Sequence, residues 1–165
     1  MSAIIREAGP EDDAFILALN ASSEPALGPL DAESWTRLKT LAFRVLVSEA
    51  GAERLAFMVL IRPGSAYGSD NYAWFEQRFE RHLYIDRVAV SPSAWGRGLG
   101  RGLYQYAFAL ARELGEGRLT AEVNEHPPNP ESLAFHRALG FRSLLSRPSV
   151  SGKVVAMLER SVEGA

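Results

Sequence analysis

The sequence predicts one α/β (α+β) domain in which helices flank a mixed β-sheet, and three observations support this prediction. Two β-rich runs, Phe43–Glu49 and Leu55–Ile61, are separated only by the segment AGAER, which is typical of a β-hairpin. After the hairpin, strand-like and helix-like runs alternate, which indicates crossover connections. The chain has 165 residues, of which 47% are hydrophobic, so we expect a single domain over residues 1–165 with a sizeable core.

The first half of the chain is predicted to contain a strand, two helices and the hairpin. A short apolar strand is expected within AIIREA, residues 3–8. Residues 9–22 are predicted to be helical because Pro10 and several acids stand in the first turn. Asp31 is the expected N-cap of a second helix. Residues 62–81 begin with loop-forming residues and end in a stretch compatible with a short helix.

The second half alternates strands and helices. His82–Val90 is dense in apolar and β-branched residues and is predicted to be a strand, and a helix over Leu99–Leu114 follows it. The remaining predictions are a strand at 118–124, a helix that ends at Gly140, and strands at 141–146 and 154–158. The resulting order, β-α-α-β-β-β-α-β-α-β-β, combines a hairpin with helical crossovers and therefore favours a mixed sheet.

Composition excludes several classes of function. The net charge of −2 argues against a nucleic-acid partner. The chain has no cysteine, so it contains no disulfide, thiolate nucleophile or cysteine-ligated metal, and His82 and His126 lack metal-ligand spacing. The N-terminal segment becomes acidic too early for a secretory signal, and no apolar run approaches the roughly 18 residues of a membrane span. We expect a cytoplasmic protein with no metal and no membrane partner.

The segment SAWGRGLGRGLY, Ser93–Tyr104, places a glycine at every second position between a predicted strand and a predicted helix. Glycines there serve either a tight turn or the exposure of backbone N–H groups beside a helix N-terminus, where an anion such as phosphate binds. Arg97 and Arg101 would add positive charge. No lysine follows these glycines, which excludes a P-loop, and the third glycine of a dinucleotide fingerprint would fall on Arg101 or Leu103.

The residues LYIDRVAVSPSAWGRGLGRGLYQYAFALA resemble motif A of the GCN5-related N-acetyltransferase (GNAT) superfamily, whose central sheet is mixed and mostly antiparallel. In that motif a strand leads into a [QR]-x-x-G-x-[GA] loop that holds the pyrophosphate of acetyl-CoA. The resemblance implies that the cofactor-binding loop consists of Trp95, Gly96, Arg97, Gly98, Leu99, Gly100 and Arg101. Trp95 departs from the usual Gln or Arg.

The residues NPESLAFHRALGF resemble motif B of the same family, N-x-x-[AS]-x-x-x-Y-x-x-x-G-F. The match supplies Asn129 and Ser132, which the resemblance assigns to cofactor binding, and it places His136 where the family has Tyr. The two motifs together cover Leu83–Phe141, and the predicted element order fits the family along the whole chain.

The resemblance implies direct transfer of an acetyl group from acetyl-CoA to a primary amine in a ternary complex, without a metal. A backbone N–H at the end of the motif A strand, within Val88, Ala89 and Val90, would polarise the thioester carbonyl. His136 stands where the family's Tyr protonates the leaving thiolate, and an imidazolium suits that role at neutral pH. The alternative is that His136 is only a polar residue on a helix face near the cofactor.

Two strand carboxylates are candidates for the base that accepts the amine proton, Asp86 and Glu122. The position of the family's commonest strand acid is Tyr84 here, and Asp86, two residues on, shares its face of the strand. The alternative for Asp86 is an ion pair with Arg87 or Arg81.

The segment between the hairpin and motif A lies where the family builds its acceptor pocket. The residues of this segment that would line the pocket are Tyr67, Asp70, Asn71, Tyr72, Trp74 and Phe75. The alternative is that the aromatic residues only cover the sheet. The expected partner is an amine, either a small molecule or a peptide, and a homodimer is left open. Because the usual Tyr and strand acid are both replaced, a non-catalytic acyl-CoA-binding or regulatory module is the alternative function.

Overall fold

The computed structural model describes residues 2–162, and its elements follow the predicted order with one helix added. The added helix, α3, occupies the second half of the 62–81 segment. The elements are β1 (Ile4–Glu7), α1 (Asp13–Ser22), α2 (Ala32–Leu41), β2 (Arg44–Ala50), β3 (Glu53–Ile61), α3 (Asp70–Arg78), β4 (Leu83–Val90), α4 (Leu99–Leu114), β5 (Arg118–His126), α5 (Pro130–Ala138), β6 (Arg142–Pro148) and β7 (Val154–Ser161), with 3-10 turns at Pro10–Asp12 and Pro92–Ala94.

The strands form a seven-stranded sheet in the order β1-β2-β3-β4-β5-β7-β6. The pairs β1/β2, β2/β3, β5/β7 and β6/β7 are antiparallel. Strands β4 and β5 pair in parallel, through Leu83 with Leu119 and Tyr84 with Thr120. The predicted mixed, mostly antiparallel sheet is therefore confirmed.

The chain divides into two compact units. The first holds the residues up to Ile61 together with Ile85–Tyr106. In this unit β3 is buried continuously from Leu55 to Ile61, as expected for a strand covered on both faces. Helix α2 begins at the predicted cap, since the Asp31 carboxylate accepts a hydrogen bond from the Ser34 N–H at 2.7 Å, and it buries Trp35 one turn later.

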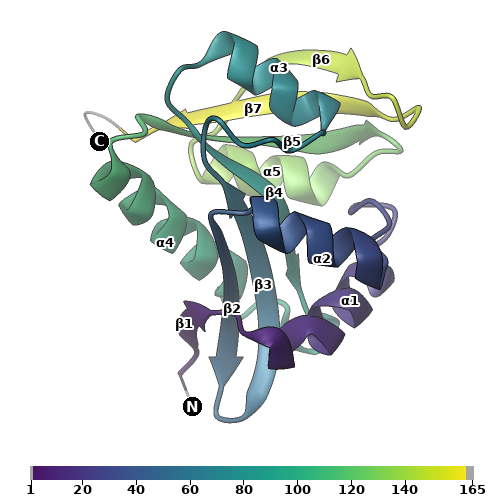
Figure 1. The fold of residues 1–165 in the computed structure, drawn as a ribbon, viewed down its shortest axis with the longest axis vertical. Coiled ribbons are helices and arrows are strands. Elements are labelled where there is room, and N and C mark those ends of the chain that lie inside the picture. Colours follow the sequence, from purple (N-terminus) through teal and green to yellow (C-terminus); the bar gives the residue numbers. More distant parts are fainter. Residues whose placement is uncertain (1, 163–165) are drawn as a thin grey trace. The chain divides into compact units, whose positions relative to one another are not determined.

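The second unit holds Arg62–Tyr84 and the residues from Ala107 onward. Figure 1 shows α3 and α5 on opposite faces of its strands β5, β7 and β6. Helix α3 starts at Ser69, whose side chain accepts a hydrogen bond from the Tyr72 N–H, and packs through Tyr72 and Phe75, three residues apart on one face. Both rings contact Tyr84, with ring centroids 5.3 and 5.8 Å away.

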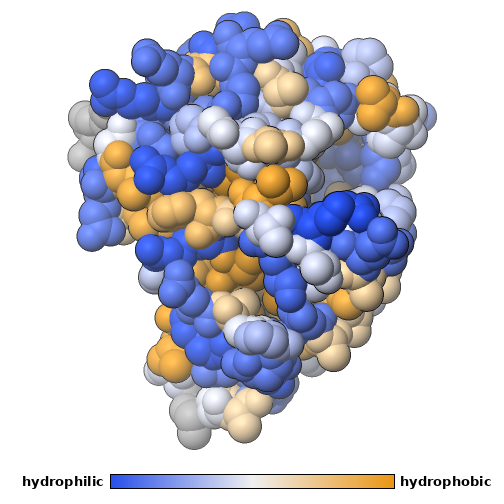
Figure 2. All heavy atoms as spheres, in the orientation of Figure 1, coloured by the Kyte–Doolittle hydropathy of each residue, from blue (hydrophilic) through white to orange (hydrophobic). Residues whose placement is uncertain are grey.

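The visible surface over α3 is mostly hydrophilic, whereas a small apolar spot lies near the turn between β6 and β7 (Figure 2). Val150 in this turn is 89% exposed. Among residues 2–162, no helix is both long and apolar enough to cross a lipid bilayer.

Candidate functional site

The glycine-rich segment forms an open loop in the first unit. Gly96 and Gly98 have φ values of 79° and 76°, a backbone conformation that favours glycine, and a Cβ added at either position would meet no atom within 4 Å. The 16-residue helix α4 begins directly after the loop, so the N–H groups of its first turn have no acceptor within the helix. A cavity of about 360 Å³ borders the loop and is lined by Ser2, Ala3, Ile5, Ser48, Arg97, Gly98, Leu99 and Gly102.

Trp95 opens this loop with a fixed orientation. Its indole Nε1–H donates a hydrogen bond to the carbonyl oxygen of Val90, the last residue of β4, at 2.8 Å. The Trp95 side chain is nevertheless 68% exposed. Arg97 and Arg101 are also exposed. Open backbone, a helix N-terminus and two arginines fit the pyrophosphate end of a CoA molecule.

Asp86 lies in β4 and pairs with its neighbour. Its Oδ2 is 3.4 Å from Arg87 Nε, and both side chains are largely buried. Arg87 also donates hydrogen bonds to Asn20 Oδ1 at 2.9 Å and to the Gly28 carbonyl at 2.7 Å. The ion pair that the sequence left open as an alternative is therefore present, and the hydrogen bonds of Arg87 join β4 to α1 and to the segment after α1.

Glu122 lies in β5, in the second unit, beside the tyrosine at the family's acid position. The phenol oxygen of the fully buried Tyr84 is 2.7 Å from both carboxylate oxygens of Glu122. The register explains this contact: Tyr84 pairs with Thr120, and Glu122 follows two residues later on the same face. Tyr84 holds the Glu122 carboxylate in place. Because Glu122 is only half-buried, it still reaches solvent.

Asn71, at the start of α3, connects Glu122 to an arginine that the sequence did not single out. Its Nδ2 donates to Glu122 Oε1 at 3.3 Å, and its Oδ1 accepts from Arg147 Nη1 at 2.8 Å. Arg147 Nη1 is also 3.7 Å from Asp70 Oδ2, and Asp70 accepts a hydrogen bond from the Val150 N–H. We call Asp70, Asn71, Glu122 and Arg147 the α3 polar cluster. Of these, only Arg147 was missed, because no motif marks it.

The motif B residues shape the start of α5. Asn129 is the N-cap, and its Oδ1 accepts a hydrogen bond from the Ser132 N–H at 3.4 Å. His136 is buried, with Nδ1 2.7 Å from the Ser132 carbonyl oxygen, and its ring lies edge-on to Phe135 and Phe141. Burial lowers the pKa of His136 below its ordinary value, despite the opposing hydrogen bond to Ser132.

The aromatic residues predicted to bind the acceptor differ in exposure. Tyr72 and Phe75 are buried in the packing of α3. The Tyr72 hydroxyl donates to the Arg62 carbonyl at 2.7 Å, and burial raises the pKa of Tyr72 to about 12. Trp74 and Tyr67 are half-buried. The Trp74 ring contacts Phe75, and the Tyr67 ring contacts Tyr72. For Tyr72 and Phe75, packing on the sheet accounts for the contacts observed.

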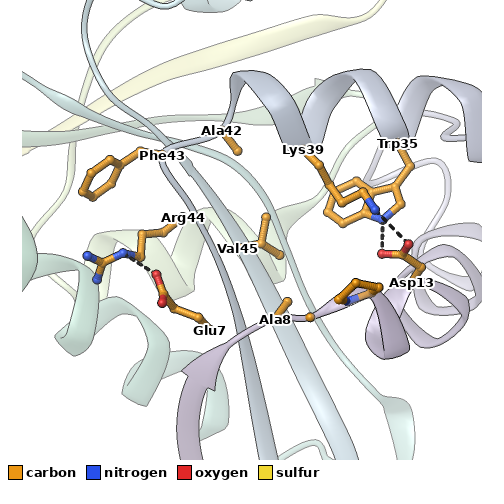
Figure 3. Close-up of a pocket in the computed structure, with 11 residues that line it drawn as sticks. Glu7, Ala8, Asp13, Trp35, Lys39, Ala42, Phe43, Arg44 and Val45 are labelled. Atoms are coloured by element: carbon orange, nitrogen blue, oxygen red, sulfur yellow. Dashed lines mark hydrogen bonds and ion pairs between the residues drawn. The ribbon is translucent and has the colours of Figure 1, made fainter.

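A separate cavity of about 310 Å³ lies in the first unit between β1, α2 and β2 (Figure 3). It contains none of the residues that the sequence singled out for the site. Its charged side chains are paired: Lys39 with Asp13 at 2.8 Å and Arg44 with Glu7 at 2.7 Å. In the part of the chain that is described, no three histidine or acidic residues are grouped to hold a metal ion.

Comparisons with known proteins agree with the motifs. The profile of the Acetyltransferase (GNAT) family matches residues 31–141. The L-amino acid N-acyltransferase MnaT of Escherichia coli K12 is 30% identical over 121 residues, which make up 73% of this chain and 63% of that protein. The streptothricin acetyltransferase of Streptomyces lavendulae is 32% identical over 77 residues, 47% of this chain and 38% of the relative. The chain thus spans less than two thirds of either relative's length.

Solved structures share the fold. Ard1 from Thermoplasma volcanium superposes with a TM-score of 0.80 at 18% identity and 98% coverage of both chains. The Salmonella typhimurium protein yncA, solved with its cofactor acetyl-CoA, superposes with a TM-score of 0.72 at 22% identity, covering all of this chain and 96% of the other. Because the family profile spans both motifs, the chain belongs to the GNAT acetyltransferase family.

Proposed function

We propose that the protein transfers an acetyl group from acetyl-CoA to the primary amine of a small molecule, directly and within a ternary complex. The observation that carries the proposal is the open glycine loop at the start of α4, which fits a pyrophosphate. Membership of the GNAT family supports the reaction type. The two sequence relatives, named for L-amino acids and for streptothricin, support a small-molecule acceptor.

In this proposal the first unit holds the acetyl donor. The N–H groups of the first turn of α4 and the backbone at Gly96 and Gly98 bind the pyrophosphate, and Arg97 and Arg101 add charge at the rim. A backbone N–H within Val88, Ala89 and Val90 polarises the thioester carbonyl.

In the second unit, Glu122 is the preferred base. An amine must lose a proton to attack the thioester carbonyl, and a carboxylate or a water molecule that it holds can accept that proton. Glu122 is fixed by Tyr84 and Asn71 and remains half-exposed. Asp86 is the second candidate, because its carboxylate is already paired with Arg87.

His136 suits packing better than proton donation. A general acid must carry its proton before the thiolate leaves, whereas burial lowers the pKa of His136 and favours the neutral imidazole at neutral pH. The Asn129 oxygen is engaged as the cap of α5, so contact with the cofactor is assigned to its amide nitrogen and to the Ser132 hydroxyl.

The test is a binding titration with acetyl-CoA, followed by an assay of CoA release over amino acids, polyamines, aminoglycosides and peptides. We expect acetyl-CoA to bind and at least one class of small amine to release CoA at a rate that rises from acid towards neutral pH. Binding without release for any amine would indicate the non-catalytic module. Absence of acetyl-CoA binding by the folded protein would contradict both functions.

A further inference from the structure

We propose that the acceptor is an amine that also carries a carboxylate, such as an α-amino acid, and that Arg147 binds this carboxylate while Glu122 faces the amine. This inference rests on the proposed function and names the substrate class of the same site. It follows from the geometry of the α3 polar cluster in the second unit.

The sheet register brings the two charged residues to one face. Glu122 of β5 pairs with Met157 of β7, and Arg147 of β6 pairs with Val155, two residues away on the same strand. Residues two apart on a strand point to the same side of a sheet. Glu122 and Arg147 therefore share the face that α3 covers, and Asn71 of α3 contacts both.

Asn71 keeps these opposite charges apart. Its amide nitrogen donates to Glu122 and its amide oxygen accepts from Arg147, so one planar amide stands between a carboxylate and a guanidinium. A ligand with an amine at one end and a carboxylate at the other would match both charges. A polyamine would offer Arg147 no carboxylate to bind.

Arg147 retains the part of its side chain that recognises carboxylates. Within residues 2–162, both of its polar contacts, to Asn71 and Asp70, use Nη1, so the edge formed by Nε and Nη2 has no protein partner there. That edge can hold a carboxylate through two parallel hydrogen bonds. The side chain is 24% exposed, so a ligand can reach it.

The first experiment compares amino acids with the amines obtained by removing their carboxylate. L-leucine is paired with 3-methylbutylamine and L-phenylalanine with phenethylamine, so that each pair shares its side chain and amine. We expect the wild-type kcat/KM to be about 30-fold higher for the amino acid in each pair, as expected for hydrogen bonds between charged groups. Binding of the same four compounds is measured by calorimetry with CoA present, so that affinity is known even without turnover.

The second experiment changes Arg147. Arg147→Met should raise KM for the amino acids about 30-fold, with kcat changed less than about threefold, and should change kcat/KM for the matched amines less than about threefold. Arg147→Lys keeps the positive charge but loses the two parallel N–H donors of the guanidinium. Its KM for the amino acids should lie between those of the wild type and Arg147→Met. The control is Arg142→Met on the same strand: the Arg142 side chain is 74% exposed, and its partner Glu159 also pairs with Arg118. Thermal unfolding confirms that each variant is folded.

The results distinguish a failure of the carboxylate site at Arg147 from a failure of the proposed acetyl transfer. Equal kcat/KM for amino acids and matched amines, or equal losses for both in folded Arg147→Met, would overturn the carboxylate site while the acetyltransferase proposal stands. Amino-acid binding that depends on Arg147, but without CoA release, would support the site and overturn the proposed reaction. If the four compounds neither bind nor react, the substrate class is wrong.

Discussion

Two clusters of arginines and acids, one in each unit, differ in how completely their charges are paired. In the first unit, the buried Asp12 carboxylate accepts two hydrogen bonds from Arg6 at 2.8 Å, one from Arg54 Nε at 2.5 Å and one from the Gly9 N–H at 2.8 Å. Glu49 engages the Nε of Arg6 at 3.0 Å. In the α3 polar cluster, Glu122 is half-exposed, and the Nε and Nη2 edge of Arg147 has no partner among residues 2–162.

The difference separates charges that hold a fold together from charges that are available to a ligand. Two positive and two negative side chains balance in the Asp12 cluster, and its central carboxylate is inaccessible. Removal of one partner there leaves a buried charge without compensation. The α3 polar cluster reaches solvent and, as proposed above, binds the acceptor. We therefore expect mutations to affect stability in the first cluster and turnover in the second.

Asp12→Asn should give the largest effect. The variant removes the charge that Arg6 and Arg54 share, and we expect it to lower the free energy of unfolding by about 3 kcal/mol. Urea denaturation measures this loss, and kcat/KM of the folded variant should stay at the wild-type value. The control is Glu33→Gln, because Glu33 is exposed and its ion pair is with Arg37 one turn away, so its loss should be below about 0.5 kcal/mol.

Asp12 should also make the stability of the fold depend on pH in the acid range. Hydrogen bonds from Arg6, followed by those from Arg54 and Gly9, hold the pKa of Asp12 well below its usual range despite burial. A lowered pKa in the folded state means that the stabilisation is fully present above the unfolded pKa of about 3.9 and is lost as pH falls towards the folded value. The unfolding free energy should fall below about pH 4 in the wild type and show a flatter dependence in Asp12→Asn.

Glu122→Gln tests the second cluster. The amide can still hydrogen bond to Tyr84 but cannot accept a proton, so we expect kcat for the best amine to fall about 100-fold. The unfolding free energy should change little. Glu125→Gln on the same strand, where the exposed Glu125 accepts a hydrogen bond from Ser146, is the matched control. A wild-type kcat in Glu122→Gln would move the base to Asp86.

Gly98→Ala tests the glycine loop, whose proposed binding of acetyl-CoA depends on backbone conformation instead of charge pairing. At φ 76° an alanine is strained by about 1–2 kcal/mol, so the loop should shift and the Kd for acetyl-CoA should rise at least about tenfold. Gly152→Ala is the control, since Gly152 has a φ value of 86° and an added Cβ meets no atom within 4 Å, but it lies in the turn between β6 and β7. Calorimetric titration compares the two; equal affinities would remove this loop from the donor site.

Asn129→Ala should give the smallest effect. Loss of the α5 N-cap is expected to cost about 1 kcal/mol of stability, which Asn129→Asp should restore. If Asn129 also contacts the cofactor through its amide nitrogen, both variants should weaken acetyl-CoA binding, whereas a role in capping alone would leave the affinity unchanged. Denaturation and calorimetry measure the two effects separately.

The fold was predictable where the signal lies within a continuous stretch of sequence. The predicted bounds of α4, Leu99–Leu114, are those observed, and the cap at Asp31 was expected from its residue type. Helix α3 was only compatible with the sequence, because loop-forming residues precede it and its aromatic residues suit a strand equally well. The glycine loop belongs to the predictable part, since its conformation depends on neighbouring residues.

The α3 polar cluster was only partly predictable. Glu122 and Asp70 were recognised as acids in suitable places, but the contacts of Arg147 depend on the register of β6 with β7 and of β7 with β5. A shift of one residue in either pairing would turn Arg147 to the opposite face. The burial of His136 could not be predicted from the sequence either, because Phe141, which packs on its ring, lies beyond the end of α5.

Trp95 gives the glycine loop its own fluorescence signal. Of the three tryptophans, Trp35 is buried, Trp74 is half-buried, and Trp95 alone presents most of its ring to solvent. A collisional quencher such as iodide should therefore act mainly on the fluorescence of Trp95, and a ligand seated in the loop should shield it. A Trp95→Phe variant would remove that component, so occupation of the loop could be followed in solution without a label and before any acceptor is known.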